Sequence, residues 1–292
     1  MDGLICVNKP RDFTSFDVVA KCRGILKERR IGHGGTLDPM ATGVLPLFLG
    51  RATGAVGLCP DTEKTYLAGI QLGITTDTYD ITGTTVSTCQ PKNLGVADIE
   101  AVLSDFRGNI EQLPPMYSAV KVNGQRLYDI ARSGREIERK PRPVTIGELI
   151  CYEEDGGLFL RVTCSKGTYV RSLVHDIGQK LGCGAALSSL VRTRACGFTL
   201  EDCVTLEQLQ QCRNENDETR YLRPISDVFK TLPELDITGE KLRRFVNGAD
   251  IETDVPDGLY TVFHGGFIGI CSVAGNIGHT KKLFCDPLEI AL

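Results

Sequence analysis

The chain has 292 residues, of which 41% are hydrophobic and 24% are charged. These fractions are typical of a folded globular protein, and the length suits one large domain with a small one, or two ordinary domains. No apolar run approaches the 18 residues of a membrane-spanning helix, and the N-terminus shows no basic segment followed by a long apolar one. We expect a cytoplasmic protein without a membrane segment.

The net charge of −4 is unevenly distributed along the chain. Residues 200–292 hold 9 Lys and Arg against 16 Asp and Glu, whereas the preceding residues hold 24 against 21. Within that first part, residues 121–143 carry seven basic side chains and three acidic ones. Such a segment is typical of a phosphate-binding patch or of a solvated helix face, and charge alone leaves both interpretations open.

Hydrophobic periodicity predicts the elements of the first half of the chain. Strands are predicted at 4–7, 64–74 and 117–122, and helices at 96–106, at 126–133 and after a cap at Thr14 or Ser15. Residues 31–57 are rich in glycine and have no clear period. We therefore predict a long loop there, with at most one helical turn.

The second half of the chain alternates strands and helices without a regular βαβ rhythm. Strands are predicted at 145–152 and 158–164, followed by a helix at about 169–181 with Thr168 as a possible cap. Residues 212–223 are charged and poor in apolar side chains, so they are a candidate linker. Beyond it, we expect a helix near 239–247 and strands at 259–263, 267–273 and 280–285. The pattern favours an α+β fold with a small β-rich C-terminal part.

Twelve cysteines and four histidines are scattered along the chain. No two cysteines have the C-x-x-C spacing that structural zinc sites usually need, and disulfide scaffolds belong to short secreted chains. We expect reduced cysteines and no metal site.

The densest candidate for a functional site is GHGGTLDPMATGVL at 32–45. Its glycines allow close backbone approach, and they surround a single acidic residue, Asp38. An aspartate before a proline is often only a turn residue. A carboxylate presented by such a loop can also act as a nucleophile on a large flat ligand, and composition leaves both interpretations open.

This stretch resembles the characteristic loop of the TruB family of pseudouridine synthases, roughly G-H-x-G-T-L-D-P-x-A-x-G-V-L. Further motifs resemble the family in the same order: VNKP at 7–10 with Thr14-Ser15, KTY at 64–66, PPMYSAVK at 114–121 and CSKGTYVR at 164–171. The resemblance covers about residues 1–200 well and the remainder weakly. Asp12 stands where the family usually has glycine, and Asp tolerates unusual backbone angles better than most residues.

The resemblance implies an α+β pseudouridine synthase fold with a mixed, mainly antiparallel sheet and a small β-rich C-terminal domain. The catalytic domain would span residues 1–211 and would include an RNA-clamping insertion at about 121–143. The C-terminal domain would span residues 224–292, and an RNA-binding role is one interpretation of it.

The resemblance also implies roles for six residues. Asp38 corresponds to the catalytic nucleophile, Tyr66 to the tyrosine that stacks on the target base, and Arg171 to the arginine that pairs with the catalytic carboxylate. His33 corresponds to the residue that fills the space left by the extruded nucleotide. The two remaining positions are predicted to contact the substrate: Tyr169 and Leu190.

The implied reaction is the isomerisation of uridine 55, in the T loop of tRNA, to pseudouridine without a cofactor. The expected partner is the T arm of tRNA, with no guide RNA, and the expected state is a monomer. Whether the carboxylate attacks C1′ of the ribose or C6 of the base stays open. A guide-dependent relative of box H/ACA particles is an alternative, disfavoured by the short segment before the first motif. A tRNA-folding protein without chemistry is another.

Overall fold

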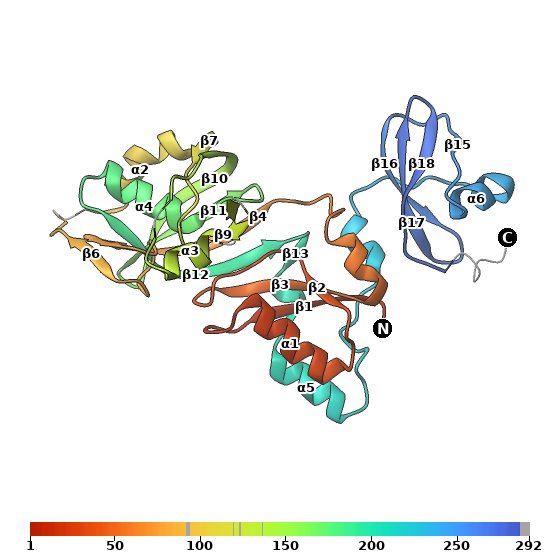
Figure 1. Ribbon diagram of the computed structural model, residues 1–292, viewed down its shortest axis with the longest axis horizontal. Helices are drawn as coiled ribbons and strands as arrows, with labels where there is room; N and C mark the ends of the chain where they lie inside the picture. Colours follow the sequence, from red (N-terminus) through yellow and green to blue (C-terminus); the bar gives the residue numbers. More distant parts are fainter. Residues whose placement is uncertain (92–93, 119, 123, 136, 287–292) are drawn as a thin grey trace.

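A ten-stranded β-sheet forms the centre of the fold in the computed structural model, which describes residues 1–91, 94–118, 120–122, 124–135 and 137–286 (Figure 1). Its strands are β1 (Gly3–Lys9), β2 (Ile31–His33), β3 (Thr42–Leu49), β4 (Lys64–Leu72), β7 (Gly108–Gln112), β10 (Arg142–Glu154), β11 (Gly157–Cys164), β12 (Ala185–Ala195), β13 (Phe198–Thr199) and β14 (Cys203–Val204). Eight of them follow the order β14–β1–β3–β12–β4–β11–β10–β7, while β2 pairs with β3 and β13 with β12. Only β1/β14 and β3/β12 are parallel pairs within this sheet. The predicted fold class, α+β with a mixed, mainly antiparallel sheet, is confirmed.

Helices cover the two halves of this sheet. One pair, α1 (Ser15–Leu26) and α5 (Leu206–Asn214), packs on β1 and β3. A second pair, α2 (Val96–Leu103) and α4 (Val170–Lys180), packs on β4, β10, β11 and β12. The remaining short helices are η1 (Gly50–Ala55), η2 (Ser104–Phe106), α3 (Leu127–Arg132), η3 (Leu200–Asp202), η4 (Ile225–Phe229) and α6 (Gly239–Val246). Thr14 caps α1 as predicted, because its hydroxyl accepts from the Asp17 amide at 3.0 Å.

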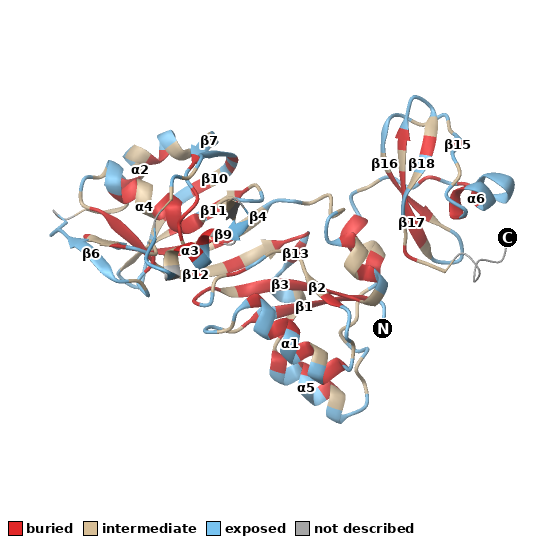
Figure 2. Cartoon of the chain, viewed as in Figure 1, coloured by how far each residue is buried: buried red, intermediate tan, exposed pale blue. Residues whose placement is uncertain are grey.

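The prediction of a loop over residues 31–57 is wrong. This stretch forms β2, β3 and η1, and β3 is one of the most buried strands of the sheet (Figure 2). Val44 and Phe48 face one hydrophobic core, while Leu45 and Leu47 face another on the opposite side. A strand buried on both faces has no polar positions to alternate with the apolar ones, so it lacks the period of two that identifies a strand.

Two further predictions need correction. The strand predicted at 117–122 is confined to β8 (Lys121–Val122), which pairs with β9 (Gln125–Arg126). Residue 119 of the predicted strand, and residues 123 and 136 of the predicted clamp, lie outside the described part. Before it the chain turns, because the Ser118 amide donates to the Met116 carbonyl at 3.0 Å. The predicted linker at 212–223 contains the last turn of α5, and Arg223 pairs with Leu4 of β1.

Two further small sheets, besides the β8–β9 pair, complete the described chain. The hairpin of β5 (Ile74–Thr76) and β6 (Thr85–Thr88) follows β4. The C-terminal part holds β15 (Ile251–Glu252), β16 (Gly258–Phe263), β17 (Phe267–Ala274) and β18 (Ile277–Leu283) in the order β15–β18–β17–β16. Figure 1 shows this sheet and α6 at the opposite end of the molecule from α2. The predicted β-rich C-terminal part is therefore present.

All twelve cysteines lie in the described part, and all of them except Cys285 are free thiols. Cys6, Cys22, Cys151 and Cys164 are buried in the hydrophobic cores. None of the helices described in the structure is long and apolar enough to cross a bilayer.

Candidate active site

The loop between β2 and β3 carries Asp38, and buried side chains hold its backbone. Arg192 of β12 is fully buried, and its guanidinium donates to the carbonyl oxygens of Gly35 at 3.0 Å, Thr36 at 3.3 Å and Val44 at 2.8 Å. A buried guanidinium needs acceptors for its N–H groups, and this loop supplies them. The loop is therefore anchored to the sheet from within.

A second buried cation holds the other end of the same loop. Lys9 of β1 is fully buried, and its ammonium donates to three carbonyl oxygens, those of Pro10, Phe13 and Pro39. Burial lowers the pKa of Lys9 to about 8. The backbone next to Asp38 is thus tied both to β1 and to β12.

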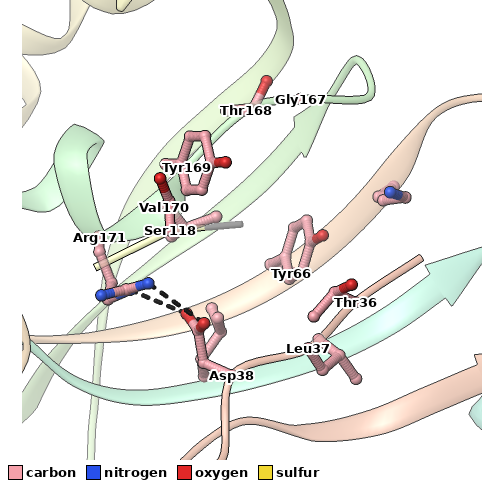
Figure 3. Close-up of a pocket in the computed structure, with 12 residues that line it drawn as sticks. Thr36, Leu37, Asp38, Tyr66, Ser118, Gly167, Thr168, Tyr169, Val170 and Arg171 are labelled. Atoms are coloured by element: carbon pink, nitrogen blue, oxygen red, sulfur yellow. Dashed lines mark hydrogen bonds and ion pairs between the residues drawn. The ribbon is translucent and has the colours of Figure 1, made fainter. Parts of the chain in front are cut away.

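Asp38 forms an ion pair with Arg171, which lies in the first turn of α4. Arg171 Nε is 2.8 Å from Asp38 Oδ2, and Nη2 donates to Oδ1 at 3.1 Å (Figure 3). The same guanidinium donates to the carbonyl oxygens of Thr78 at 3.0 Å and Tyr117 at 2.8 Å. Two contacts to one carboxylate fix its orientation. The Asp38 side chain is still 36% exposed, so a ligand can reach it.

A second carboxylate, Asp80, stands behind Arg171. Its Oδ2 lies 3.6 Å from Arg171 Nη1, and the side chain is only 6% exposed. Its Oδ1 accepts from the Thr82 amide and from the Thr78 hydroxyl, both at 2.9 Å. Asp80 therefore holds the arginine that in turn holds Asp38.

A cavity of about 220 Å³ lies next to the ion pair, and five of the six predicted site residues line it: Asp38, Tyr66, Tyr169, Arg171 and Leu190. In Figure 3 the rings of Tyr66 and Tyr169 both lie above the Asp38 carboxylate. The other lining residues are Thr36, Leu37, Lys64, Ser118, Gly167, Thr168 and Val170. An ion pair next to two aromatic rings suits a flat polar ligand.

Strand register and one buried amide place these rings. Tyr66 on β4 lies opposite Arg192 on β12, and Leu190 lies two residues earlier on β12. Gln112 fixes the backbone of Tyr169, because it accepts from the Tyr169 amide at 2.7 Å and donates to its carbonyl at 3.0 Å. Burial raises the pKa of the Tyr66 phenol above its ordinary value. The phenol is therefore protonated at neutral pH and can donate a hydrogen bond.

The sixth predicted residue, His33, does not line this cavity. It lies on β2, and its Nδ1 accepts from the Gly35 amide at 3.3 Å. Burial lowers the pKa of the imidazole, so the ring is neutral at pH 7. His33 thus supports the start of the Asp38 loop from outside the cavity.

A second cavity of about 360 Å³ shares Asp38 and Arg171 with the first. Tyr117 and Tyr128 line it and pack edge to face, with ring centroids 6.1 Å apart. The ion pair therefore stands between two hollows, each lined by aromatic rings. No group of three or more metal-binding side chains occurs among the residues that the structure describes.

Sequence reasoning missed four charged residues of this region: Lys9, Lys64, Asp80 and Arg192 act at or behind the cavity. For Lys64 a signal was present, because it lies two residues before Tyr66 on a strand and so projects to the same face. Asp80 lies in the polar run TTDTYD, which has no period that points to a site.

Two family models match the chain. The model of the TruB family pseudouridylate synthase N-terminal domain matches residues 23–170, and the model of the tRNA pseudouridylate synthase B C-terminal domain matches residues 171–231. Among solved structures, a Cbf5–Nop10–Gar1 complex is similar, with a TM-score of 0.75 and 27% identity over 98% of this chain and 85% of that chain.

Curated relatives named tRNA pseudouridine synthase B are similar over almost the whole length. The protein of Clostridium kluyveri is 44% identical over 92% of this chain and 95% of its own length. That of Bacillus velezensis is 43% identical over 94% of this chain and 91% of its own length. With this identity and coverage, and with both family models matched, the chain belongs to the TruB family of pseudouridylate synthases.

Proposed function

We propose that this enzyme isomerises uridine 55 in the T loop of tRNA to pseudouridine, with Asp38 as the nucleophile. The observation that carries the proposal is the Asp38–Arg171 ion pair at the wall of a cavity lined by two tyrosines and a leucine. The name of the relatives, tRNA pseudouridine synthase B, supports tRNA as the substrate.

The side chains around the cavity suit each stage of this reaction. The target base has to leave its stack, which costs a few kcal/mol, and stacking on Tyr66 with apolar contact from Leu190 offsets that cost. Asp38 attacks the nucleotide and the N1–C1′ bond breaks. The uracil then turns, C5 bonds to C1′ and the bond to Asp38 breaks, so that the carboxylate is regenerated. The proton on C5 is released to solvent, and N1, which has lost its bond to C1′, takes up a proton. No electrons are gained or lost overall.

Arg171 and Tyr66 have distinct roles in this proposal. The guanidinium holds and orients the Asp38 carboxylate when RNA excludes water from the cavity, because it contacts both carboxylate oxygens. Tyr66 stacks on the uracil and its phenol can take part in the late proton transfer. Tyr169 packs against the substrate from the start of α4.

The segment at about 121–143 is proposed to clamp the T arm. Its Arg135 and Lys140 are exposed, and Gly124 and Gly134 have positive φ angles of 82° and 72°, which are accessible to glycine at little cost. The exposed cations of this segment would neutralise phosphates of the RNA backbone. We further propose that the enzyme works as a monomer in the cytoplasm, without a guide RNA.

Tritium release from a T-arm hairpin labelled at C5 of its uridines tests the proposal. We expect wild type to release one tritium per hairpin with no other RNA or protein present. Asp38→Asn should bind the hairpin as tightly as wild type and release none, because the amide is not a nucleophile. Release by Asp38→Asn at the wild-type rate would disprove the nucleophile assignment.

The same assay separates the two alternatives. No release by wild type with binding intact would favour a guide-dependent enzyme or a tRNA-folding protein. Addition of a guide RNA with its partner proteins would then distinguish those two.

A further inference from the structure

Lys64 is a cation of the active-site cavity that the proposed reaction does not use. It begins β4 and lines the same cavity as Asp38 and Tyr66. In the part of the chain that the structure describes, its ammonium has no hydrogen bond and no ion pair, whereas Arg171, the other cation of the cavity, contacts two carboxylates. The Lys64 ammonium is not among the buried polar atoms, so solvent reaches it. A ligand that displaces this water has to supply an acceptor to the charge, which favours an anionic group at this position.

The surroundings of Lys64 increase this need for an anion. Burial lowers the pKa of Lys64, and the positive charge of Arg192 lowers it further. Arg192 donates to carbonyl oxygens, which carry no formal negative charge. Two cations thus lie close to Gly35 of the Asp38 loop, and the described chain supplies no carboxylate to either.

The Asp38 loop leaves room for the Lys64 ammonium. Gly35 has a φ of +124°, and a Cβ at this position would lie only 2.9 Å from Lys64 Nζ. Glycine at position 35 therefore leaves space for the Lys64 ammonium and also allows the positive φ of the backbone. The tip of Lys64 therefore lies against the Asp38 loop, where a nucleotide bound at Asp38 would also lie.

The position of Lys64 along its strand identifies the part of the nucleotide that it would meet. Lys64 and Tyr66 point to the same face of β4, and Tyr66 is 7% exposed, while Lys64 lies at the strand end and is partly exposed. A base stacked on Tyr66 occupies the deeper part of the cavity, so its sugar and phosphates lie toward the rim. An ammonium is a compact charge with three donors, which suits a phosphate oxygen.

We propose that Lys64 binds a backbone phosphate directly flanking the extruded target uridine. This inference rests on the proposed function, because it takes the occupant of the cavity to be an RNA nucleotide. The contact holds the nucleotide by its backbone while the base is detached and turned. The enzyme would thereby bind the RNA through a backbone contact that does not depend on the identity of the base.

The test combines substitution of Lys64 with neutralisation of single phosphates. Two hairpins carry a methylphosphonate, one on the 5′ side and one on the 3′ side of the target uridine, and binding and single-turnover rates are measured for each. For wild type, we expect one of the two to weaken binding or slow conversion about 10- to 100-fold, as for loss of a charged hydrogen bond. Lys64→Met should show that loss on the native hairpin and no further loss on the modified one.

Matched variants control for charge and folding. Lys64→Arg keeps the cation and should keep the methylphosphonate penalty, and Lys64→Met should lower the dependence of log Kd on log salt by about one unit. Lys180→Met removes an exposed lysine that pairs with Asp105 at the far end of α4, and should leave the penalty unchanged. Thermal unfolding of each variant shows that it is folded.

The outcomes separate this inference from the proposed function. If wild type converts uridine but each methylphosphonate weakens binding or slows conversion equally for wild type and Lys64→Met, the phosphate contact is wrong and the proposed function stands. If neither methylphosphonate affects wild type, the inference is wrong whether or not Lys64→Met folds. If wild type binds the native hairpin but converts no uridine, the proposed function fails, while the binding measurements still decide the contact.

Discussion

At the scale of single residues, the arrangement around Arg171 explains why this position needs an arginine. The guanidinium meets two oxygens of Asp38, two backbone carbonyls and the carboxylate of Asp80. An ammonium has the charge but not the planar fork that reaches these acceptors together. Charge alone would therefore leave Asp38 free to rotate.

Arg171→Lys is therefore expected to lower the single-turnover rate about 100-fold, which corresponds to loss of one or two charged hydrogen bonds. Binding of the hairpin should change much less, because the residue acts on the nucleophile. Arg161→Lys is the matched control, since Arg161 is exposed on β11 and pairs with Glu148. Equal rates for Arg171→Lys and wild type would show that the ion pair is dispensable.

Asp176 on α4 offers a second test at this scale, through pH. Burial raises its pKa from 3.8 to about 6. Between these two pH values the folded state therefore binds more protons than the unfolded state. The contribution of the Asp176 carboxyl to the free energy of unfolding falls as pH rises from about 4 to 6. Asp176→Asn removes this fall, so we expect it to be more stable than wild type at pH 8 by about 1–2 kcal/mol, a value reduced for partial exposure.

Urea denaturation at pH 5 and pH 8 measures the effect. The difference in unfolding free energy between variant and wild type should grow from the lower pH to the higher. A difference that is the same at both values would contradict the buried, protonated carboxyl.

At the scale of elements, the contact between β3 and β12 depends on one glycine. Gly43 has a φ of +102°, and a Cβ there would lie 2.2 Å from the carbonyl oxygen of Arg192. Gly43→Ala is expected to destabilise the protein by about 3 kcal/mol through overpacking and backbone strain. It should also lower activity, because Arg192 anchors the Asp38 loop.

Gly24 in α1 provides the control for this substitution. No atom would lie within 4 Å of a Cβ at Gly24. Gly24→Ala should therefore stabilise the protein by about 0.5–1 kcal/mol, through helix propensity. Denaturant midpoints that shift in the same direction for both variants would disprove the packing argument.

These elements also show what the sequence can and cannot predict. Tyr66 was placed on a strand because β4 has one polar face, whereas β3 was missed because burial on both faces removes the alternation. The predicted site residues came from motifs, and motifs contain the residues that meet the substrate. Asp80 and Arg192 act through other protein groups, and only the folded register brings them to Arg171 and the Asp38 loop.

At the scale of the whole molecule, charge is unevenly distributed along the chain, and one hydrophobic core joins segments that are far apart in the sequence. Residues 200–292 are acidic overall, yet Lys241, Arg243 and Arg244 are exposed together on α6. Before α6 in the sequence, Phe229 of η4 packs in one hydrophobic core with Phe48 of β3. The division into a catalytic domain through 211 and a C-terminal domain from 224 stays a prediction.

We expect the cations of α6 to contact tRNA outside the T arm. Replacing Lys241, Arg243 and Arg244 with Gln should weaken binding of full-length tRNA severalfold and reduce its salt dependence, since each lost phosphate contact lowers the slope. Binding of the isolated T-arm hairpin should be unchanged. Equal weakening for both RNAs would place α6 at the T arm, and no weakening for either would exclude a role for this helix.

The anchoring of the Asp38 loop by Lys9 and Arg192 has a consequence for hydration. Carbonyl oxygens of this loop accept from buried cations on the protein side, and these contacts do not involve solvent. When RNA displaces water from the cavity, these oxygens lose no hydrogen bond. The dehydration cost of closing the site therefore falls mainly on the charged side chains that face the cavity, Asp38 and Lys64, and on the substrate. For Asp38 and the substrate, the loss of water also increases reactivity.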